Sequence, residues 1–248
     1  MAKVNKTSKK GLPVMAHLVL GYPTLAESLQ TAQQYITSGC EILELQIPFS
    51  HPTADGPVIT EACRDAIEKN HVTVEDCFEA MATLRNLYPQ QEIIVMTYLN
   101  RLFTFGLEAF TVALHDLQIT HLIVPDLPVD SPLARQISEK SIQLVPVLAA
   151  NVSQQRLENL LQLGFDFYYL MSDFKITGSG FSLHPRINEI ITVIKENQPS
   201  ARIGIGFGIS TPEQVRLVTE TADVAIIGSS LIKAQSEGRL AAYFESLQ

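Results

Sequence analysis

The segment 41–57, EILELQIPFSHPTADGP, carries two acidic residues whose surroundings differ. Glu44 interrupts an apolar run typical of a buried strand, and Asp55 stands between alanine and glycine in a proline-rich loop. A carboxyl group removed from water favours its protonated form and can donate a proton near neutral pH. Because two carboxyl groups in different environments can divide the acid and base roles, the pair predicts acid–base chemistry.

The alternation of side chains along the strand indicates where Glu44 points. Leu43 and Leu45 lie on one side, and Glu44 shares the other side with Ile42 and Gln46. If the leucines pack beneath helices, Glu44 projects to the inside of the sheet. Each acid also has a structural alternative, since a buried glutamate can serve in an ion pair and Asp-Gly is a common turn. Their occurrence together favours a functional role.

Glycine-rich segments follow the last two predicted strands. Residues 204–212, GIGFGISTP, and residues 228–230, GSS, each lead from a strand into a helix. Free backbone N–H groups at a helix N-terminus bind phosphate, and in an α/β barrel these two loops are the frequent phosphate site. The two segments together predict a phosphorylated substrate. A third glycine-bearing loop, residues 175–180, is expected either to close over the ligand or to be an ordinary mobile loop.

The sequence shows no pattern typical of metal binding, nucleophilic catalysis, Schiff-base catalysis or nucleic-acid binding. The six histidines show no metal-ligand spacing, so no metal site is predicted, and no G-x-S-x-G nucleophile motif is present. Lys175 lies in a loop, where a solvated lysine is expected rather than a Schiff-base lysine. The net charge of −8 argues against nucleic-acid binding. Without a secretory signal or a membrane-length apolar run, the protein is expected to be cytoplasmic and not membrane-bound.

Apolar runs and helical stretches alternate along the whole chain. Several of the runs, such as LIV and LVPVL, are apolar on both faces, which indicates parallel strands covered on both sides. Helix start signals occur between the runs, at Thr24, Ser131, Ser153 and Thr211. The predicted strands are Val14–Leu20, Glu41–Ile47, Glu92–Tyr98, His121–Pro125, Gln143–Leu148, Asp166–Met171, Ala201–Gly206 and Asp223–Ile227.

Eight strands alternating with helices in a chain of 248 residues predict an α/β fold, a single-domain (β/α)8 TIM barrel. Residues 13–248 form the predicted catalytic domain, and residues 1–12 a flexible tail. An open doubly wound sheet is the structural competitor. Its dinucleotide-binding form is disfavoured, because no G-x-G-x-x-G follows the first strand. In a barrel, the polar residues that follow the strands, including Tyr98, Asn100, Asp126 and Tyr169, become site candidates.

The segment LELQIPFSHPTADGP resembles a signature of one family, the α subunit of tryptophan synthase. Similarity continues in the family's order through MTYLN, VPDLPVDS, YYLMS followed by ITG, GFGISTPEQV and IIGSSLIK. It covers nearly all of the chain from about Leu18 onward. This resemblance implies a lyase that cleaves indole-3-glycerol phosphate to indole and glyceraldehyde 3-phosphate in tryptophan biosynthesis. It also implies a β-subunit partner in an α2β2 assembly, and no cofactor here, because pyridoxal phosphate belongs to the β subunit.

The resemblance also assigns roles to residues. Glu44 matches the acid that protonates the indole ring carbon, and Asp55 matches the aspartate that holds the indole N–H. Tyr169 matches a tyrosine of the same site, and Thr177 matches a loop threonine that steadies the aspartate. The remaining expected substrate- and phosphate-binding residues are Tyr98, Gly178, Gly208, Gly228 and Ser229.

Departures from the family pattern leave alternatives open: the polar tail replaces an N-terminal helix that members often carry, and three further places differ. Gln46 stands where the family has glycine, His51 replaces an aspartate, and Asp173–Lys175 replaces Arg-Ser-Gly. The departures spare the two carboxylates but fall where the family meets its β subunit. A free-standing lyase that releases indole is therefore one alternative. A catalytically quiet regulatory partner is a second, and another phosphate-binding barrel, such as an isomerase, is a third.

Overall fold

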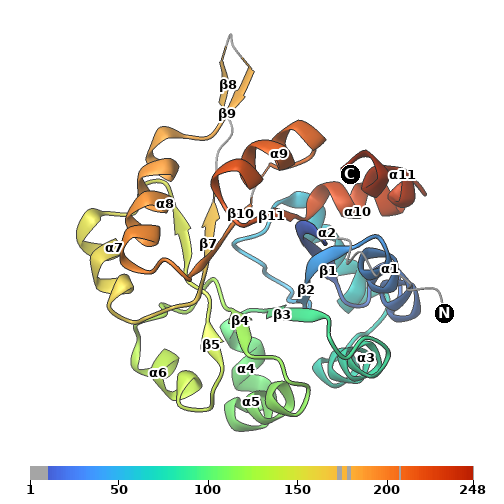
Figure 1. The fold of residues 1–248 in the computed structure, drawn as a ribbon. Helices are drawn as coiled ribbons and strands as arrows, with labels where there is room; N and C mark the ends of the chain where they lie inside the picture. The colour runs from blue at the N-terminus through green and yellow to red at the C-terminus, as the bar shows by residue number, and fades with distance from the viewer. Residues whose placement is uncertain (1–10, 172–174, 178–179, 207, 248) are drawn as a thin grey trace, which may run out of the picture.

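The computed structural model describes residues 11–171, 175–177, 180–206 and 208–247. Strands form a central ring and helices surround it, with the N-terminal blue strand beside the red C-terminal strand (Figure 1). The predicted (β/α)8 barrel is confirmed. The predicted N-terminal tail falls mainly on residues outside the described part and stays a prediction.

All strand pairs of the barrel sheet are parallel. The order of strands in this sheet is β5-β4-β3-β2-β1-β11-β10-β7-β6. The strands are β1 (Leu12–Val19), β2 (Cys40–Gln46), β3 (Glu92–Met96), β4 (His121–Ile123), β5 (Gln143–Leu144), β6 (Val147–Ala149), β7 (Phe167–Met171), β10 (Arg202–Gly206) and β11 (Val224–Ile227). Each predicted strand overlaps an observed one.

The fifth predicted strand is split into β5 and β6 by Pro146. Proline has no N–H to donate to a neighbouring strand, so the ladder is interrupted there. The chain nevertheless continues the ring, because Val145 N donates to Leu122 O on one side and Tyr169 N donates to Pro146 O on the other. The two pieces therefore act as one barrel strand that closes the circle.

The helices pack around the outside of the barrel (Figure 1). Their predicted N-caps are confirmed: the side chains of Thr24, Ser131, Ser153 and Thr211 each accept a hydrogen bond from the first turn. The helices are α1 (Leu25–Thr37), α2 (Pro57–Glu68), α3 (Val74–Leu87), α4 (Leu99–Phe105), α5 (Leu107–Asp116), α6 (Pro132–Ser138), α7 (Gln154–Leu161), α8 (Pro185–Asn197), α9 (Pro212–Thr221), α10 (Ser229–Ser236) and α11 (Leu240–Ser246).

Buried apolar residues form two layers separated by the sheet. Leu43 and Leu45 belong to the large cluster between strands and helices. Ile42, their neighbour on the opposite face of β2, belongs to a smaller cluster that also contains Met15 and Tyr98. The predicted orientation of the β2 side chains is thus confirmed, and it places Glu44 on the inner face of the barrel.

The segment after the sixth barrel strand differs from the prediction of a plain loop. Its described part contains two short antiparallel strands, β8 (Lys175–Thr177) and β9 (Gly180–Ser182). Figure 1 shows this hairpin projecting from the barrel, beyond α8 and α9. Gly178 and the departure at Asp173–Phe174 lie outside the described residues.

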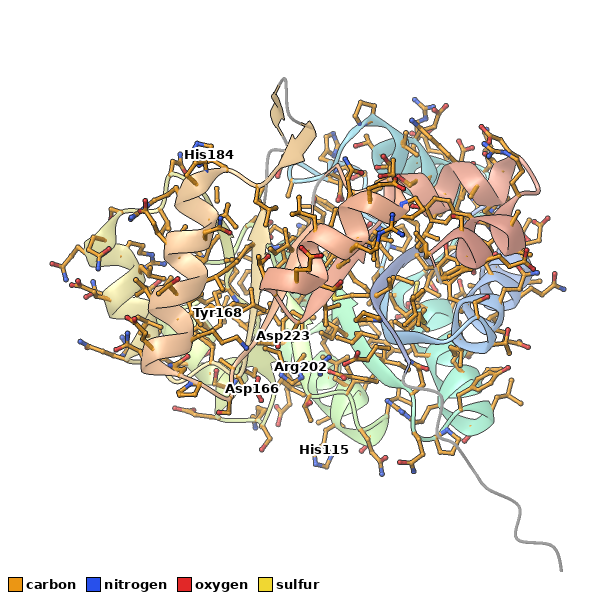
Figure 2. The ribbon with its side chains drawn as sticks, turned by 45° about the horizontal axis from the view of Figure 1, so that its top comes forward. His115, Asp166, Tyr168, His184, Arg202 and Asp223 are labelled. Atoms are coloured by element: carbon orange, nitrogen blue, oxygen red, sulfur yellow. The ribbon has the colours of Figure 1, made fainter. Side chains whose placement is uncertain are left out.

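Charged residues cluster where several strands begin. Arg202, the first residue of β10, donates to both carboxylate oxygens of Glu92 at 2.9 and 2.7 Å and to Glu41 at 2.8 Å. Figure 2 shows Arg202, Asp166 and Asp223 close together, away from His184 at the start of α8. These contacts fasten the amino end of the barrel and leave the carboxyl ends of the strands for a site.

Candidate active site

A cavity of about 390 Å³ opens among the carboxyl ends of the strands and the loops that follow them. Its volume suits a small organic molecule. One part of the wall is acidic, one is apolar, and one is rich in glycine and serine. The lining residues are His17, Glu44, Ala54, Asp55, Gly56, Ile59, Met96, Ile123, Pro125, Val147, Tyr169, Met171, Gly208, Ile209, Ser210, Ile226, Gly228, Ser229, Ser230 and Lys233.

Glu44 is buried, with 4% of its surface exposed, and faces a histidine on the neighbouring strand. The parallel register of β1 and β2 sets His17 beside Glu44. His17 Nδ1 lies 3.3 Å from Glu44 Oε1. Burial alone lowers the pKa of His17, but the Glu44 carboxylate, helped by Asp55, outweighs this effect and the net pKa is raised. The pair therefore favours a proton on the imidazole.

Asp55 is held by two donors on one carboxylate oxygen. Gln46 Nε2 donates to Asp55 Oδ2 at 2.7 Å, and the Tyr98 hydroxyl donates to the same atom at 3.0 Å. The hydroxyl of Tyr98 in turn accepts from Ala54 N at 3.0 Å. The proline-rich loop is thus fixed against β2 and β3, and Asp55 faces the cavity in a set orientation.

Burial raises the pKa of the Asp55 carboxyl, although His17 and the two hydrogen-bond donors act in the opposite direction. Tyr169 is a third inward-facing group, on β7. Its pKa is held well above the usual range by burial and by the nearby carboxylates Glu44 and Asp55. The phenol therefore stays neutral and retains its proton at physiological pH.

Glycine at position 206 makes room for Tyr169. A β-carbon on Gly206 would lie 2.3 Å from the Tyr169 hydroxyl oxygen and 2.7 Å from its ring. No such approach is tolerated between non-bonded atoms, so any larger residue would displace the phenol. Part of the glycine-rich segment at the end of β10 thus serves packing inside the barrel rather than phosphate binding.

The glycine- and serine-rich wall lies at the start of α10. Gly228 is its N-cap and provides no side-chain hydrogen bond; Leu231 N donates to Gly228 O at 2.9 Å, which leaves the N–H groups of Ser229 and Ser230 for another acceptor. Lys233, one turn further along the helix, lines the same cavity. A helix N-terminus with a nearby ammonium group attracts an anion.

The start of α9 is less open than that of α10. Gln214 reaches back, and its Oε1 accepts from Ser210 N at 2.7 Å and from Thr211 N at 3.1 Å. Gly208 precedes this turn with a φ of 81°, a conformation that favours glycine. Of the two predicted phosphate-binding segments, the one after β11 therefore offers more unoccupied N–H groups.

Between these polar ends the wall is apolar. Met96, Ile123, Val147 and Met171 contribute from consecutive barrel strands, and Ile226 contributes from β11. Such a wall favours a flat hydrocarbon or aromatic group. The cavity thus combines acids, an apolar slot and an anion-binding helix terminus, which is the arrangement expected for a phosphorylated aromatic substrate.

The cavity brings together most of the predicted site residues. Tyr98 lies outside the cavity wall and acts through Asp55. Thr177 is on β8, and Gly178 falls outside the described part. The predicted residues on the wall are Glu44, Asp55, Tyr169, Gly208, Gly228 and Ser229.

His17 and Lys233 line the cavity without being among the predicted site residues. His17 carries the same signal that singled out Glu44, because it interrupts an apolar strand, VMAHLVL, on the face shared with Met15. Lys233 carries no such signal, since an exposed lysine in the second turn of a helix is ordinary. Its relevance comes only from the approach of α10 to the barrel.

Within the described residues, no group of three or more histidine, cysteine or acidic side chains is arranged to hold a metal ion. Over the same residues, no helix is both long enough and apolar enough to cross a membrane.

Comparison with known proteins gives the family. The model described as tryptophan synthase alpha chain matches residues 1–243. The tryptophan synthase alpha chain of Syntrophotalea carbinolica is 31% identical over 237 residues, covering 94% of this chain and 92% of the relative. The chain belongs to the tryptophan synthase alpha chain family. The resemblance seen in the sequence is thereby confirmed.

Further relatives of the tryptophan synthase alpha chain family agree. The alpha chain of Shouchella clausii is 34% identical over 227 residues, covering 91% of this chain and 83% of the relative. A structure of Mycobacterium tuberculosis tryptophan synthase has a TM-score of 0.84 at 27% identity, covering 96% of this chain and 91% of that one. The region matched to the family therefore includes the barrel and every lining residue of the cavity.

Proposed function

We propose that this chain is a lyase that cleaves indole-3-glycerol phosphate to indole and glyceraldehyde 3-phosphate in tryptophan biosynthesis. The observation that carries the proposal is the shared cavity of Glu44 and Asp55, with an uncapped helix N-terminus on the same wall. The family to which the chain belongs agrees with this activity.

The reaction needs the indole ring to become a leaving group. Glu44, as an acid, protonates the ring carbon that carries the glycerol chain, and positive charge develops on the ring nitrogen. Asp55 accepts a hydrogen bond from that N–H and stabilises the charge. The electron pair of the broken carbon–carbon bond returns to the ring, and the glycerol hydroxyl loses its proton to Glu44 as its oxygen becomes a carbonyl.

The remaining groups position the substrate in this scheme. The apolar wall around Ile123 and Ile226 receives the ring. The phosphate binds at the first turn of α10, where Gly228 and Ser229 supply N–H groups and Lys233 supplies charge. We assign Thr177 and Gly178 to the same substrate, as the family resemblance implies. None of these steps requires a cofactor.

We propose a β subunit as the partner, with pyridoxal phosphate confined to that subunit. The support is the family itself, whose members carry the name alpha chain. Indole released in the cavity is then passed to the second active site. An α2β2 assembly is the expected form.

One observation favours a second candidate, a free-standing lyase that releases indole into solution. Gln46 already holds Asp55 in this single chain, with its Nε2 donating to Asp55 Oδ2 at 2.7 Å. A carboxylate that is oriented in advance needs less help from a partner-driven closure. A catalytically quiet regulator is disfavoured, because burying Glu44 without a use for it costs stability.

Product formation by the purified chain tests the proposal. Indole and glyceraldehyde 3-phosphate are expected in equal amounts from indole-3-glycerol phosphate, with and without added β subunit. A large increase on adding the β subunit supports the coupled enzyme, and high activity of the chain alone supports the free-standing lyase. No indole under either condition would refute both.

A further inference from the structure

His17 is the one imidazole on the cavity wall, as far as the described residues extend, and the scheme above gives it no task. Its Nδ1 lies 3.3 Å from Glu44 Oε1, and each side chain is only 5% exposed. Since adjacent parallel strands fix both residues in register, the contact is built into the barrel and does not depend on a mobile loop.

Among the described residues, the second polar atom of neither partner makes a close hydrogen bond, and Gln46 acts on the imidazole only as a weaker hydrogen-bonding neighbour that raises the pKa of His17. His17 Nε2 and Glu44 Oε2 are both buried and both lack a hydrogen-bond partner. A pair kept only for stability is expected to satisfy its remaining atoms, because an unsatisfied buried polar group lowers the stability of the fold. Both residues line the cavity, so a bound ligand can supply the missing hydrogen bonds.

The groups facing His17 come from several elements. Glu44 lies on β2, Asp55 on the following loop, and Gly228 packs against the imidazole from the start of α10. Tyr169 on β7 is neutral, and Lys233 is the cation on the same wall. Glu44 acts on the imidazole by direct contact, Asp55 by its charge and Gln46 by a side-chain hydrogen bond, and all three favour its protonated form.

We propose that His17 is a positioning residue that shares a single proton with Glu44. This inference rests on the proposed lyase reaction and deepens it. In the resting pair the proton is held on the imidazole, with Nδ1 3.3 Å from Glu44 Oε1, and it reaches the substrate through the Glu44 carboxyl. The ring carbon takes it as the new C–H bond forms, leaving the Glu44 carboxylate and a neutral imidazole. The glycerol hydroxyl then returns one proton to the pair as the carbon–carbon bond breaks, so the proton count is restored.

The shared proton has a consequence for pH dependence. When the pair holds a single proton, that proton can reside on His17 or on Glu44. The presence of two possible sites raises the pH at which the pair loses this proton. The raised pKa of His17 thus extends to higher pH the range in which the pair holds a proton. Removing the imidazole moves the alkaline limb of kcat to lower pH.

The first test does not require activity. The imidazole of His17 is titrated by NMR in the wild-type chain and in Glu44→Gln, with the signal assigned by its loss in His17→Gln. The wild-type midpoint is expected above 6.5 and is expected to fall by at least one pH unit in Glu44→Gln. The same midpoint in both proteins would overturn the proposal, whether or not the chain cleaves indole-3-glycerol phosphate.

The second test follows kcat against pH in His17→Gln, with His121→Gln as the matched control. His121 also pairs with an acid, Asp166 at 2.7 Å, but at the amino end of the barrel. His17→Gln is expected to lower kcat roughly tenfold to hundredfold, to change KM by less than threefold, and to move the alkaline limb down by at least one unit. An unmoved limb in His17→Gln, with normal folding, would overturn the proposal. If wild type is inactive, the lyase assignment fails separately.

Discussion

Asp55 shows how single residues prepare the site before any ligand arrives. Gln46 and Tyr98 both donate to Oδ2, so the other carboxylate oxygen is left for the ring nitrogen of the substrate. Glycine at position 46, which the family pattern has, offers no such donor. The departure at Gln46 therefore brings a positioning contact in addition to filling space.

The contact from Gln46 is tested by Gln46→Met, which keeps most of the volume but removes the N–H donor. Because that hydrogen bond lowers the pKa of Asp55, its loss raises the pKa further. The acidic limb of kcat/KM is expected to move to higher pH, and kcat/KM to fall about tenfold, in keeping with a lost hydrogen bond to a charged group.

Tyr98→Phe removes the second donor to Asp55 and is expected to shift the acidic limb in the same direction. The two pH profiles together check the account of Asp55. Profiles identical to wild type in both variants would show that neither contact matters for catalysis.

At the scale of elements, the site depends on where helices begin and strands end. The N-terminus of α10 faces the cavity without a side-chain cap, whereas the first turn of α9 is closed by Gln214. The two glycine-rich segments look alike in the sequence, and both predict phosphate binding. Their difference comes from a side chain several residues downstream, which is why it was not predictable from the glycine pattern.

Ser229→Asp tests the role of the α10 terminus. An acid in the first turn stabilises a helix by roughly 0.3–1 kcal/mol, so the thermal stability is expected to stay the same or to rise. The same charge repels a phosphate group, so KM for indole-3-glycerol phosphate is expected to rise more than tenfold. Ser229→Asn, which lacks the charge, is the matched control and should retain a KM close to wild type. Equal KM values in the two variants would place the phosphate elsewhere.

At the scale of the whole molecule, most of the architecture was predictable because strand and helix patterns are local. Eight apolar runs with helix caps between them indicate the barrel, and the alternation in β2 correctly orients Glu44. The split of the fifth strand at Pro146 also has a local cause. Long-range features did not follow from the pattern, above all the approach of Lys233 and the pairing of His17 with Glu44 across two strands.

Arg202 illustrates a contact that serves the barrel rather than the site. It joins Glu41 and Glu92 at the starts of β2 and β3, and its guanidinium lies 5.5 Å from the centre of the Phe167 ring. Arg202→Met is expected to lower the free energy of unfolding by about 1 kcal/mol, with a smaller loss at high salt because the ion pairs are partly exposed. Denaturant titrations at two salt concentrations measure this effect.

Catalysis by Arg202→Met is expected to stay within twofold of wild type, because the contact lies at the end of the barrel opposite the cavity. A large loss of kcat with an unchanged unfolding free energy would contradict this division between a stabilising end and a catalytic end.

Glu44 is proposed to be the acid that cleaves indole-3-glycerol phosphate in this cavity. The most direct measurement compares wild type with Glu44→Gln, determining substrate affinity by calorimetry and indole release under single-turnover conditions. Glu44→Gln is expected to bind the substrate within about threefold of wild type and to release indole at least a hundred times more slowly, since general acid catalysis contributes roughly 10²–10⁴-fold. Indole release at the wild-type rate by Glu44→Gln would contradict the account.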